Sequence, residues 1–263
     1  MRILTVIGAR PQFIKAAVVS QALATGGVSE VLVHTGQHFD DNMSGVFFNE
    51  LGIPQPAHNL GIGGGTHGQN TGRMIEAIER VLLECRPDWV LVYGDTDSTL
   101  AGAIAAAKLN VPLAHIEAGL RAFNRRMPEE INRVLTDHAA NLLFAPTETA
   151  VRHLANEGIS GVSVHLVGDV MYDAALFYGD KAERESSILA RLGLTSKAYA
   201  LATVHRAENT EDRCRLANIL DGFLHFRRDV VFPVHPRTRS RLSSLGLALP
   251  TNVQAIEPVG YLD

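Results

Sequence analysis

The sequence predicts an α/β protein with two doubly wound parallel sheets. Short apolar runs recur along the chain, and they are continuous rather than alternating, as expected for strands covered on both faces. Longer segments with helical features separate these runs, which is the βα alternation of parallel sheets. The alternation is interrupted near Gly168–Gly179 and then restarts. We therefore expect an N-terminal Rossmann-like domain over residues 1–179 and a C-terminal one over residues 180–263.

In the first domain, each strand is predicted where a short apolar run lies between turn signals. None of these runs approaches the length expected of a helix. The predicted strands are Ile3–Ile7, Val31–His34, Trp89–Tyr93, Leu113–Ile116, Leu142–Ala145 and Val164–Val167.

The intervening helices are predicted from their start signals and side-chain sizes. Pro11–Ala24 begins with a proline at its first position. Thr66–Glu84 begins with Thr66-x-x-Gln69, a capping-box pattern. Ser98–Leu109 carries small side chains that suit close packing on a sheet. Further helices are predicted at Asp41–Leu51, Pro128–Asn141, Thr147–Glu157 and Val170–Tyr178.

The second domain is expected to follow a polar connection over Asp180–Ser187. Its predicted elements, in order, are strand Tyr199–Val204, helix Thr210–Arg227, strand Val230–Pro233, helix Arg237–Leu245 and strand Val253–Ile256. A doubly wound sheet has the strand order 3-2-1-4-5-6 and needs more strands than this. We therefore expect the second domain to be incomplete, with the first of its strands left at an edge.

Composition excludes several classes of protein. The 46% of hydrophobic residues can offset the entropy of ordering, so the chain is not disordered. Lys and Arg total 24 against 28 for Asp and Glu, a net charge of −4 that argues against nucleic acid as a partner. Two cysteines cannot form a disulfide framework. The apolar run Ile3–Ile7 is far shorter than the roughly 20 residues that span a bilayer. We expect no membrane segment and a cytoplasmic location.

An anion site is predicted after the first strand. Gly8-Ala9-Arg10-Pro11 opens a helix whose N-terminal N–H groups are expected to be free, and Lys15 lies one turn further on. This turn is neither the G-x-G-x-x-G dinucleotide fingerprint nor a P-loop, so nicotinamide cofactors or ATP bound in those ways are not expected. The simpler alternative is that Arg10 is a surface cation and Gly8 only a turn.

Carboxylates follow the next strands, at the edge where parallel sheets bind ligands. Asp95 follows the third strand, Glu117 follows the fourth, and Glu129 and Glu130 begin the next helix. Arg10, Arg121 and Arg133 are interleaved with them. Each acid alone is compatible with helix capping or a favourable helix dipole. Together at one edge they predict an acid–base site.

Two further patterns bear on this site. Asp95-Thr96-Asp97 matches the short D-x-D motif of metal-dependent sugar transferases, but no H-E-x-x-H or zinc-type Cys/His spacing is present, and no metal is expected. His205 and His235 each come just past a second-domain strand and are expected to point toward an interdomain cleft. The glycine run Gly61–Gly65 is expected to be a flexible loop.

Seven segments, in order along the chain, resemble the non-hydrolysing UDP-N-acetylglucosamine 2-epimerase family. Finer details, such as Gly65-Thr66-His67-Gly68-Gln69 and Arg206-Ala207-Glu208-Asn209-Thr210, are similar to its UDP-2,3-diacetamido-2,3-dideoxyglucuronate 2-epimerase branch. The seven segments are Ile7–Lys15, Thr35–His38, Gly94–Thr96, His115–Arg121, Pro128–Arg133, His205-Arg206 and Pro233–His235.

The resemblance implies a glycosyltransferase-B-like arrangement of the two domains, with a UDP-sugar between them. It implies C2 epimerisation of a UDP-linked 2-acetamido sugar without a cofactor, by elimination and re-addition of UDP, for precursors of bacterial surface polysaccharides. A homodimer is also implied. The alternatives are the same chemistry on UDP-2,3-diacetamido-2,3-dideoxyglucuronate, an inactive nucleotide-sugar-binding fragment, and a sugar transferase.

Site residues follow from the resemblance position by position. Asp95, Glu117 and Glu129 match catalytic carboxylates, His205 a catalytic-site histidine, and Arg133 a supporting residue. The substrate-binding residues implied are Arg10, Lys15, His38 and His235. The family continues with a D-S-G-G-type segment and a glutamate that hold uridine, and neither follows Tyr261. We therefore expect a truncated chain.

Overall fold

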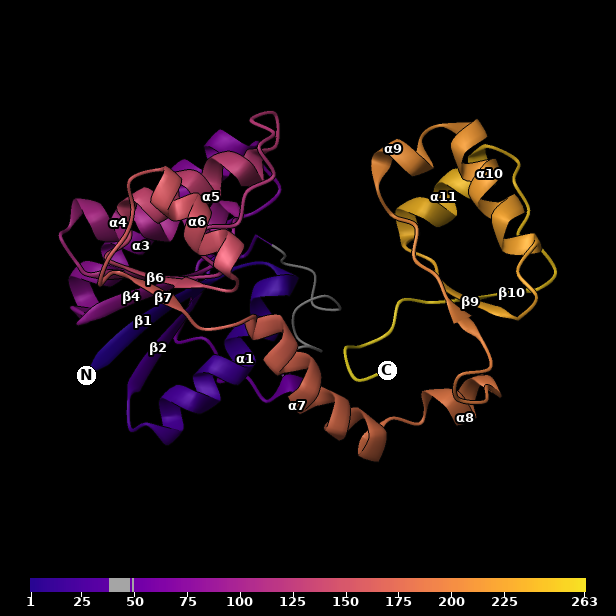
Figure 1. Ribbon diagram of the computed structural model, residues 1–263, viewed down its shortest axis with the longest axis horizontal. Helices are drawn as coiled ribbons and strands as arrows, with labels where there is room; N and C mark the ends of the chain where they lie inside the picture. Colours follow the sequence, from indigo (N-terminus) through magenta and orange to yellow (C-terminus); the bar gives the residue numbers. More distant parts are fainter. Residues whose placement is uncertain (38–47, 49) are drawn as a thin grey trace. The chain divides into compact units, whose positions relative to one another are not determined.

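The computed structural model describes residues 1–37, 48 and 50–263, and Figure 1 shows its helices and strands. The chain divides into two compact units, Met1–Asp180 and Lys181–Asp263. Each unit has its own parallel β-sheet, so the predicted α/β class is confirmed. His38 and most of the predicted helix Asp41–Leu51 lie outside the described residues.

Within the described residues, seven parallel strands form the sheet of the first unit, in the order β3-β2-β1-β4-β5-β6-β7. This is the doubly wound order that the sequence predicts. The short β3 was not predicted, because it contains no apolar run. The strands are β1 (Arg2–Ile7), β2 (Ser29–His34), β3 (His58–Asn59), β4 (Trp89–Tyr93), β5 (Leu113–Ile116), β6 (Leu142–Ala145) and β7 (Val164–Leu166).

The register of this sheet gathers the ends of four strands at one edge. Ile7 at the end of β1 lies opposite His34 at the end of β2, and Tyr93 at the end of β4 lies opposite Ile116 at the end of β5. The strand order reverses between β1 and β4, which is where doubly wound sheets bind ligands. The turns that follow these strands carry most of the predicted site residues.

Helices cover both faces of the large sheet. In Figure 1, α3, α4, α5 and α6 lie on one face, and α1 and α7 lie on the other. The small side chains of α4 allow close packing, as predicted: a Cβ added at Gly102 would lie 3.0 Å from Cγ1 of Val92. The bounds are α1 (Arg10–Thr25), α3 (His67–Cys85), α4 (Asp97–Lys108), α5 (Pro128–Ala139), α6 (Glu148–Asn156) and α7 (Val170–Glu185).

The ends of two helices test specific predictions. The Thr66 capping box is confirmed, because Thr66 Oγ1 accepts from the Gln69 N–H and the Gln69 side chain accepts from the Thr66 N–H. The prediction of a polar connection from Asp180 onward is wrong, because α7 continues to Glu185. Lys and Glu are good helix formers, and Lys181 pairs with Glu185 one turn later at 3.8 Å.

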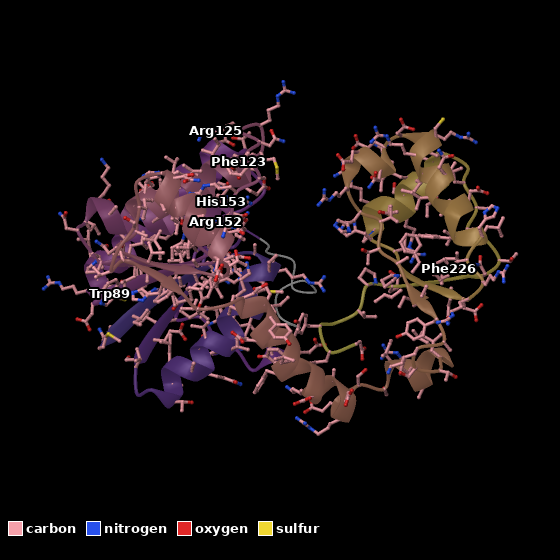
Figure 2. All side chains as sticks on the ribbon, in the orientation of Figure 1. Trp89, Phe123, Arg125, Arg152, His153 and Phe226 are labelled. Carbon is pink, nitrogen blue, oxygen red and sulfur yellow. The ribbon has the colours of Figure 1, made fainter. Side chains whose placement is uncertain are left out.

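A hollow of about 520 Å³ opens on the sheet of the first unit, next to Val19 and Leu23 of α1. Its lining is mainly apolar and includes Trp89, Leu91, Ile116, Leu142 and Phe144. The conspicuous Trp89 is labelled in Figure 2. Glu117, which follows β5, also borders this hollow. Because acid–base chemistry needs convergent polar groups, we place the candidate site at the strand ends, where Glu117 meets other polar side chains, and not among the apolar residues of the hollow.

Within the described residues, three parallel strands form the sheet of the second unit, in the order β10-β9-β8. Its core gathers Leu216, Leu220, Phe232, Val234 and Leu242. The elements are α8 (Ile188–Leu192), β8 (Ala200–Leu201), α9 (Ala207–Thr210), α10 (Arg213–Leu224), β9 (Val230–Pro233), α11 (Pro236–Ser244) and β10 (Val253–Ile256).

Two predictions for this unit need correction, and one helix was not predicted. The strand predicted at Tyr199–Val204 forms ladder pairs only at Ala200–Leu201, while α8 was not predicted at all. The helix predicted at Thr210–Arg227 is two helices, because Asp212 caps α10 by accepting a hydrogen bond from the Arg215 N–H at 3.0 Å. Among the described residues, no helix has the length and apolar character required to cross a membrane.

The Gly8→Ala substitution tests the packing at the switch point. A Cβ at Gly8 would overlap the hydroxyl groups of Thr35 and Ser98. We expect the free energy of unfolding to fall by about 1–3 kcal/mol, measured by urea denaturation. Gly72→Ala in α3 is the matched control, since nothing lies within 4 Å of its added Cβ, and it should gain about 0.5–1 kcal/mol. Equal stability of Gly8→Ala and the parent would contradict the packing argument.

Candidate active site

The β1–α1 turn is held by a buried glutamine. The Gln12 side-chain oxygen accepts from the N–H groups of Gly8 (2.8 Å) and Ala9 (3.0 Å). Its amide nitrogen donates to the Tyr93 carbonyl and to Thr99 Oγ1, both at 3.0 Å. Two N–H groups that the sequence predicts to be free for an anion are therefore occupied, and that part of the expectation is wrong. Gln12 instead ties this turn to the β4–α4 turn.

Arg10 remains the cation of this turn. It begins α1 and is half-buried. Burial lowers the pKa of Arg10, while the negative charge of Glu50 acts in the opposite direction. A guanidinium stays charged at neutral pH in either case. Arg10 is therefore a permanent positive charge at the switch point.

Lys15 and Glu117 form a largely buried ion pair across the switch point. Lys15 is only 7% exposed, and its ammonium group contacts the carboxylate of Glu117 just after β5. The pair lies against Gly94, where an added Cβ would be 3.0 Å from Glu117 Oε2 and 3.2 Å from Lys15 Nζ. Gly94 also has a φ of +62°, which favours glycine. Glu117 is thus positioned beside the residue that precedes Asp95.

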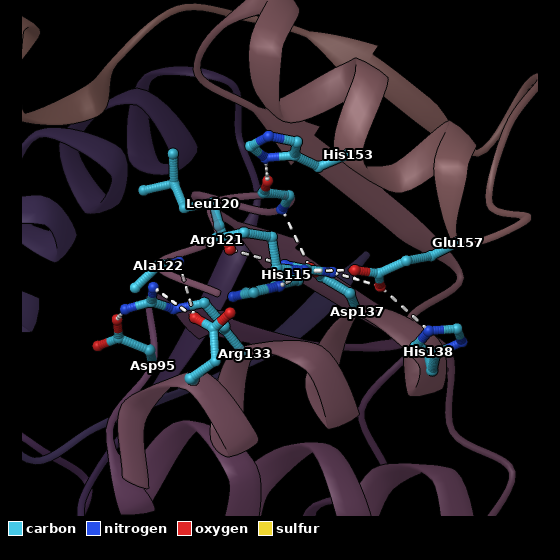
Figure 3. A network of polar contacts seen from close by, with 12 residues as sticks. Asp95, His115, Leu120, Arg121, Ala122, Arg133, Asp137, His138, His153 and Glu157 are labelled. Atoms are coloured by element: carbon cyan, nitrogen blue, oxygen red, sulfur yellow. Dashed lines mark hydrogen bonds and ion pairs between the residues drawn. The ribbon is translucent and has the colours of Figure 1, made fainter. Parts of the chain in front are cut away.

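Asp95 is paired with a cation from α5. Arg133 contacts the Asp95 carboxylate and donates to Glu130 at 3.0 Å, as Figure 3 shows. Asn132 donates to the Asp95 carbonyl at 2.9 Å and to Asp97 at 3.2 Å. Helix α5 therefore holds the side chain and the backbone of the turn that carries Asp95.

The adjacent Glu129 and Glu130 have different environments. Glu130 is 2% exposed and accepts from the N–H groups of Ala122 (2.9 Å) and Phe123 (2.8 Å). It therefore holds the loop before α5, whose Phe123 packs edge-on against His153 (Figure 2). Glu129 is exposed at the start of α5. Of these two carboxylates, Glu129 is the one placed to meet a ligand.

Arg121 belongs to a buried ionic network and not to the open edge. Its guanidinium donates to Asp137 and, with two nitrogens, to Glu157, all at 2.7 Å. Burial tends to raise the pKa of Asp137, but hydrogen bonds and charge from His115 and Arg121 outweigh it and lower the pKa overall. The Arg121 hydrogen bond likewise lowers the pKa of Glu157. The network is structural.

The two aspartates of the D-x-D motif have separate partners. Asp97 contacts His67 at 2.8 Å and accepts from Asn132, whereas Asp95 contacts Arg133. Among the residues that the structure describes, no group of three or more His, Cys, Asp or Glu side chains is arranged to hold a metal ion.

The remaining predicted residues lie in the second unit. His205 is exposed after β8. His235 caps α11 by accepting from the Arg237 N–H at 3.2 Å through Nδ1, which leaves its ring hydrogen on Nε2. Within the first unit, the structure brings together Lys15, Glu117, Asp95 and Arg133 through the turn at Gly94.

The family model described as UDP-N-acetylglucosamine 2-epimerase matches residues 21–263. The chain belongs to this epimerase family. The family predicted from sequence motifs is therefore confirmed.

Relatives of this epimerase-family chain include named enzymes and solved structures. It is 56% identical to the UDP-2,3-diacetamido-2,3-dideoxy-D-glucuronate 2-epimerase of Pseudomonas aeruginosa, over 100% of the chain and 74% of that protein. The Methanocaldococcus jannaschii UDP-GlcNAc 2-epimerase in complex with UDP-GlcNAc and UDP matches with a TM-score of 0.89 at 44% identity, over 100% of this chain and 75% of that one. The Neisseria meningitidis UDP-GlcNAc 2-epimerase bound to UDP-GlcNAc matches with a TM-score of 0.87 at 31% identity, over 100% and 74%. These matches confirm the predicted glycosyltransferase-B-like fold class.

Glu157→Gln tests the buried network through its pH dependence. Because the folded-state pKa of Glu157 is lowered, its stabilisation is present above the unfolded pKa of about 4.3 and is lost as pH falls through the folded value. We expect the variant to lose about 1–2 kcal/mol at about pH 7, and the difference from the parent to shrink below about pH 4, measured by urea unfolding.

Glu76→Gln is the control, since Glu76 pairs with Arg80 on an exposed helix face at 3.1 Å. It should change the free energy of unfolding by less than about 0.5 kcal/mol at either pH. Equal losses at pH 7 for the two variants would show that the Glu157 pair is no stronger than a surface pair.

Proposed function

We propose that this chain catalyses epimerisation at C2 of a UDP-linked 2-acetamido sugar. The observation that carries the proposal is the pair of carboxylates Asp95 and Glu117, which follow neighbouring strands and each face a cation, Arg133 and Lys15. The arrangement occurs at the switch point of a chain that belongs to the epimerase family. Solved relatives of this family hold UDP-GlcNAc and UDP.

The proposed chemistry follows from the substrate. The C2 hydrogen is not next to a carbonyl group, so simple deprotonation is too costly. A carboxylate takes the C2 proton while the C1–O bond breaks, its electron pair leaves on UDP, and a C1–C2 double bond forms. UDP then adds back at C1, and a carboxylic acid delivers a proton to the opposite face of C2. The site must exchange protons on two faces and stabilise a leaving diphosphate.

We assign the proton transfers to Asp95, Glu117 and the exposed Glu129. Arg133 contacts the Asp95 carboxylate and Lys15 contacts the Glu117 carboxylate, so each of these two groups is held in place by a cation from another element. Two separately held carboxylates suit transfers on two faces of one ring.

We assign UDP binding to Arg10, Lys15, His38 and His235, and a place in the site to His205. Arg10 supports this assignment as a permanent cation at the switch point, where developing diphosphate charge needs stabilisation. A homodimer stays a prediction from the family resemblance, and a cytoplasmic location stays a prediction from the composition and the short apolar runs of the sequence.

A second substrate has specific support. The relative from Pseudomonas aeruginosa, at 56% identity, is a UDP-2,3-diacetamido-2,3-dideoxy-D-glucuronate 2-epimerase, whereas the relative from Methanocaldococcus jannaschii, at 44%, is a UDP-N-acetylglucosamine 2-epimerase. The same elimination serves both sugars, because both carry hydrogen and an acetamido group at C2.

Deuterium exchange tests the chemistry. In D2O, the chain should place deuterium at C2 of its UDP-sugar without an acceptor, followed by NMR. Asp95→Asn and Glu117→Gln should each lower kcat by about 10²–10⁴-fold, because each removes a proton-transfer group, while binding of the UDP-sugar persists. Glu148→Gln, an exposed carboxylate at the start of α6, is the control and should keep the parent kcat.

The alternative functions predict different results in the same deuterium-exchange experiment. A sugar transferase would release UDP only with an acceptor or a metal ion, and a binding module would bind without exchange. Parent kcat values in both carboxylate variants would overturn the site assignment.

Substrate choice is tested by offering each UDP-sugar separately. If the second candidate is right, UDP-2,3-diacetamido-2,3-dideoxyglucuronate should exchange at C2 with a kcat/KM about tenfold or more above that of UDP-N-acetylglucosamine, since a carboxylate and an extra acetamido group offer further contacts. A higher kcat/KM for UDP-N-acetylglucosamine would restore the first candidate.

A further inference from the structure

The buried His115 contacts the turn that carries Asp95 and lies two residues before Glu117 in the sequence. His115 lies on β5 with its side chain fully buried. One ring nitrogen, Nε2, is 2.7 Å from the Gly94 carbonyl, directly before Asp95. The other, Nδ1, is 2.7 Å from Asp137 Oδ1 on α5. Figure 3 shows the His115 ring beside Asp137.

The two contacts determine how many hydrogens the ring carries. A carbonyl oxygen only accepts, so Nε2 of His115 carries a hydrogen. Burial tends to raise the pKa of Asp137, but hydrogen bonds and charge from His115 and Arg121 lower it overall, so this carboxylate is ionised at neutral pH. Its other oxygen accepts from the Gly119 N–H at 3.1 Å and from Arg121 at 2.7 Å. A bare Nδ1 at 2.7 Å from such an oxygen would set two lone pairs against each other. Nδ1 therefore carries a hydrogen as well.

The charged groups around the ring fit an imidazolium. Asp137 is its counterion and is shared with Arg121, whose second partner is Glu157. Glu157 in turn contacts His138 at 3.2 Å. Asp137 thus faces both Arg121 and the His115 ring, and Glu157 faces Arg121 from the other side. The buried charges are therefore paired, which is the condition for keeping them out of water.

The same contacts link the residues that flank Glu117. His115 lies on β5 two residues before Glu117, and Gly119 lies two residues after Glu117 and donates to the same carboxylate of Asp137. Glu117 itself has a φ of +75°, a strained conformation for a non-glycine residue. Such strain persists only where the surroundings impose it, and Asp137 holds the chain on both sides of Glu117.

We propose that His115 is a positioning residue, doubly protonated, that ties the turn carrying Asp95 to the loop carrying Glu117 by donating to Gly94 and Asp137. Its effect on turnover rests on the proposed epimerase function. Its proton count and its two contacts do not.

Nitrogen NMR of the full chain tests the proton count. With the histidines labelled with ¹⁵N, both ring nitrogens of His115 should show an attached hydrogen at about pH 7. The assignment comes from the signals that disappear in His115→Gln. A ring with one bare nitrogen at that pH would overturn the proposal, whatever the activity of the chain.

Two variants separate the two contacts. His115→Gln can keep a donor near Gly94 but loses the bond to Asp137, and His115→Asn can do the reverse. Neither ties both turns, so each should lower kcat by about tenfold to 100-fold, with KM for the UDP-sugar within about twofold of the parent. The control is His138→Gln, at the half-exposed outer end of the network, which should keep the parent kcat.

The outcomes distinguish this proposal from the proposed function. An active parent with unchanged kcat in both folded His115 variants overturns the positioning role. An inactive parent overturns the proposed function. In that case the backbone amide signals of Asp95 and Glu117 test whether His115 ties the turn carrying Asp95 to the loop carrying Glu117. Both should shift in His115→Gln and not in His138→Gln, and unshifted signals overturn it.

Discussion

The close approach of the β1–α1 and β4–α4 turns at the switch point is the constraint on which the site depends. The strand order reverses there, so the turns that follow the neighbouring strands β1 and β4 lie beside each other. The backbone polar groups of both turns need hydrogen-bond partners. Gln12 supplies them by bridging the two turns with both ends of its amide. Gly8 leaves room for the hydroxyl groups of Thr35 and Ser98. The carboxylate chemistry is built around this junction.

Charge pairing decides which ionisable groups are structural and which are available. Taking a charge out of water is costly unless a partner and hydrogen bonds compensate it. Asp137 and Arg121 meet that condition in the interior, and their carboxylate and guanidinium atoms are saturated with partners. Asp95 and Glu117 each have a cation on one side and remain partly exposed. The same requirement for charge pairing thus accounts for the buried network and for the partly exposed carboxylates at the strand ends.

Local patterns in the sequence were sufficient for most of the fold. Continuous apolar runs located strands such as Trp89–Tyr93 and Leu113–Ile116 with the observed bounds, because parallel strands are apolar on both faces. Short elements such as β3 and α8 were missed, because so few residues show no period. The end of α7 was misplaced, because charged residues suit both an exposed helix and a linker. The motif order along the chain was enough for the family.

Only the tertiary structure decided what each charged residue does. Glu129 and Glu130 are neighbours with the same chemistry, and burial alone makes one a loop anchor and leaves the other exposed. The partners of Lys15 and His115 come from other elements, far away in the sequence, so no local pattern reveals them. The sequence by itself determined the fold class, the strand ends and the set of candidate carboxylates, since these follow from local periodicity. The pairings required the folded chain, because electrostatic contacts depend on distance in space.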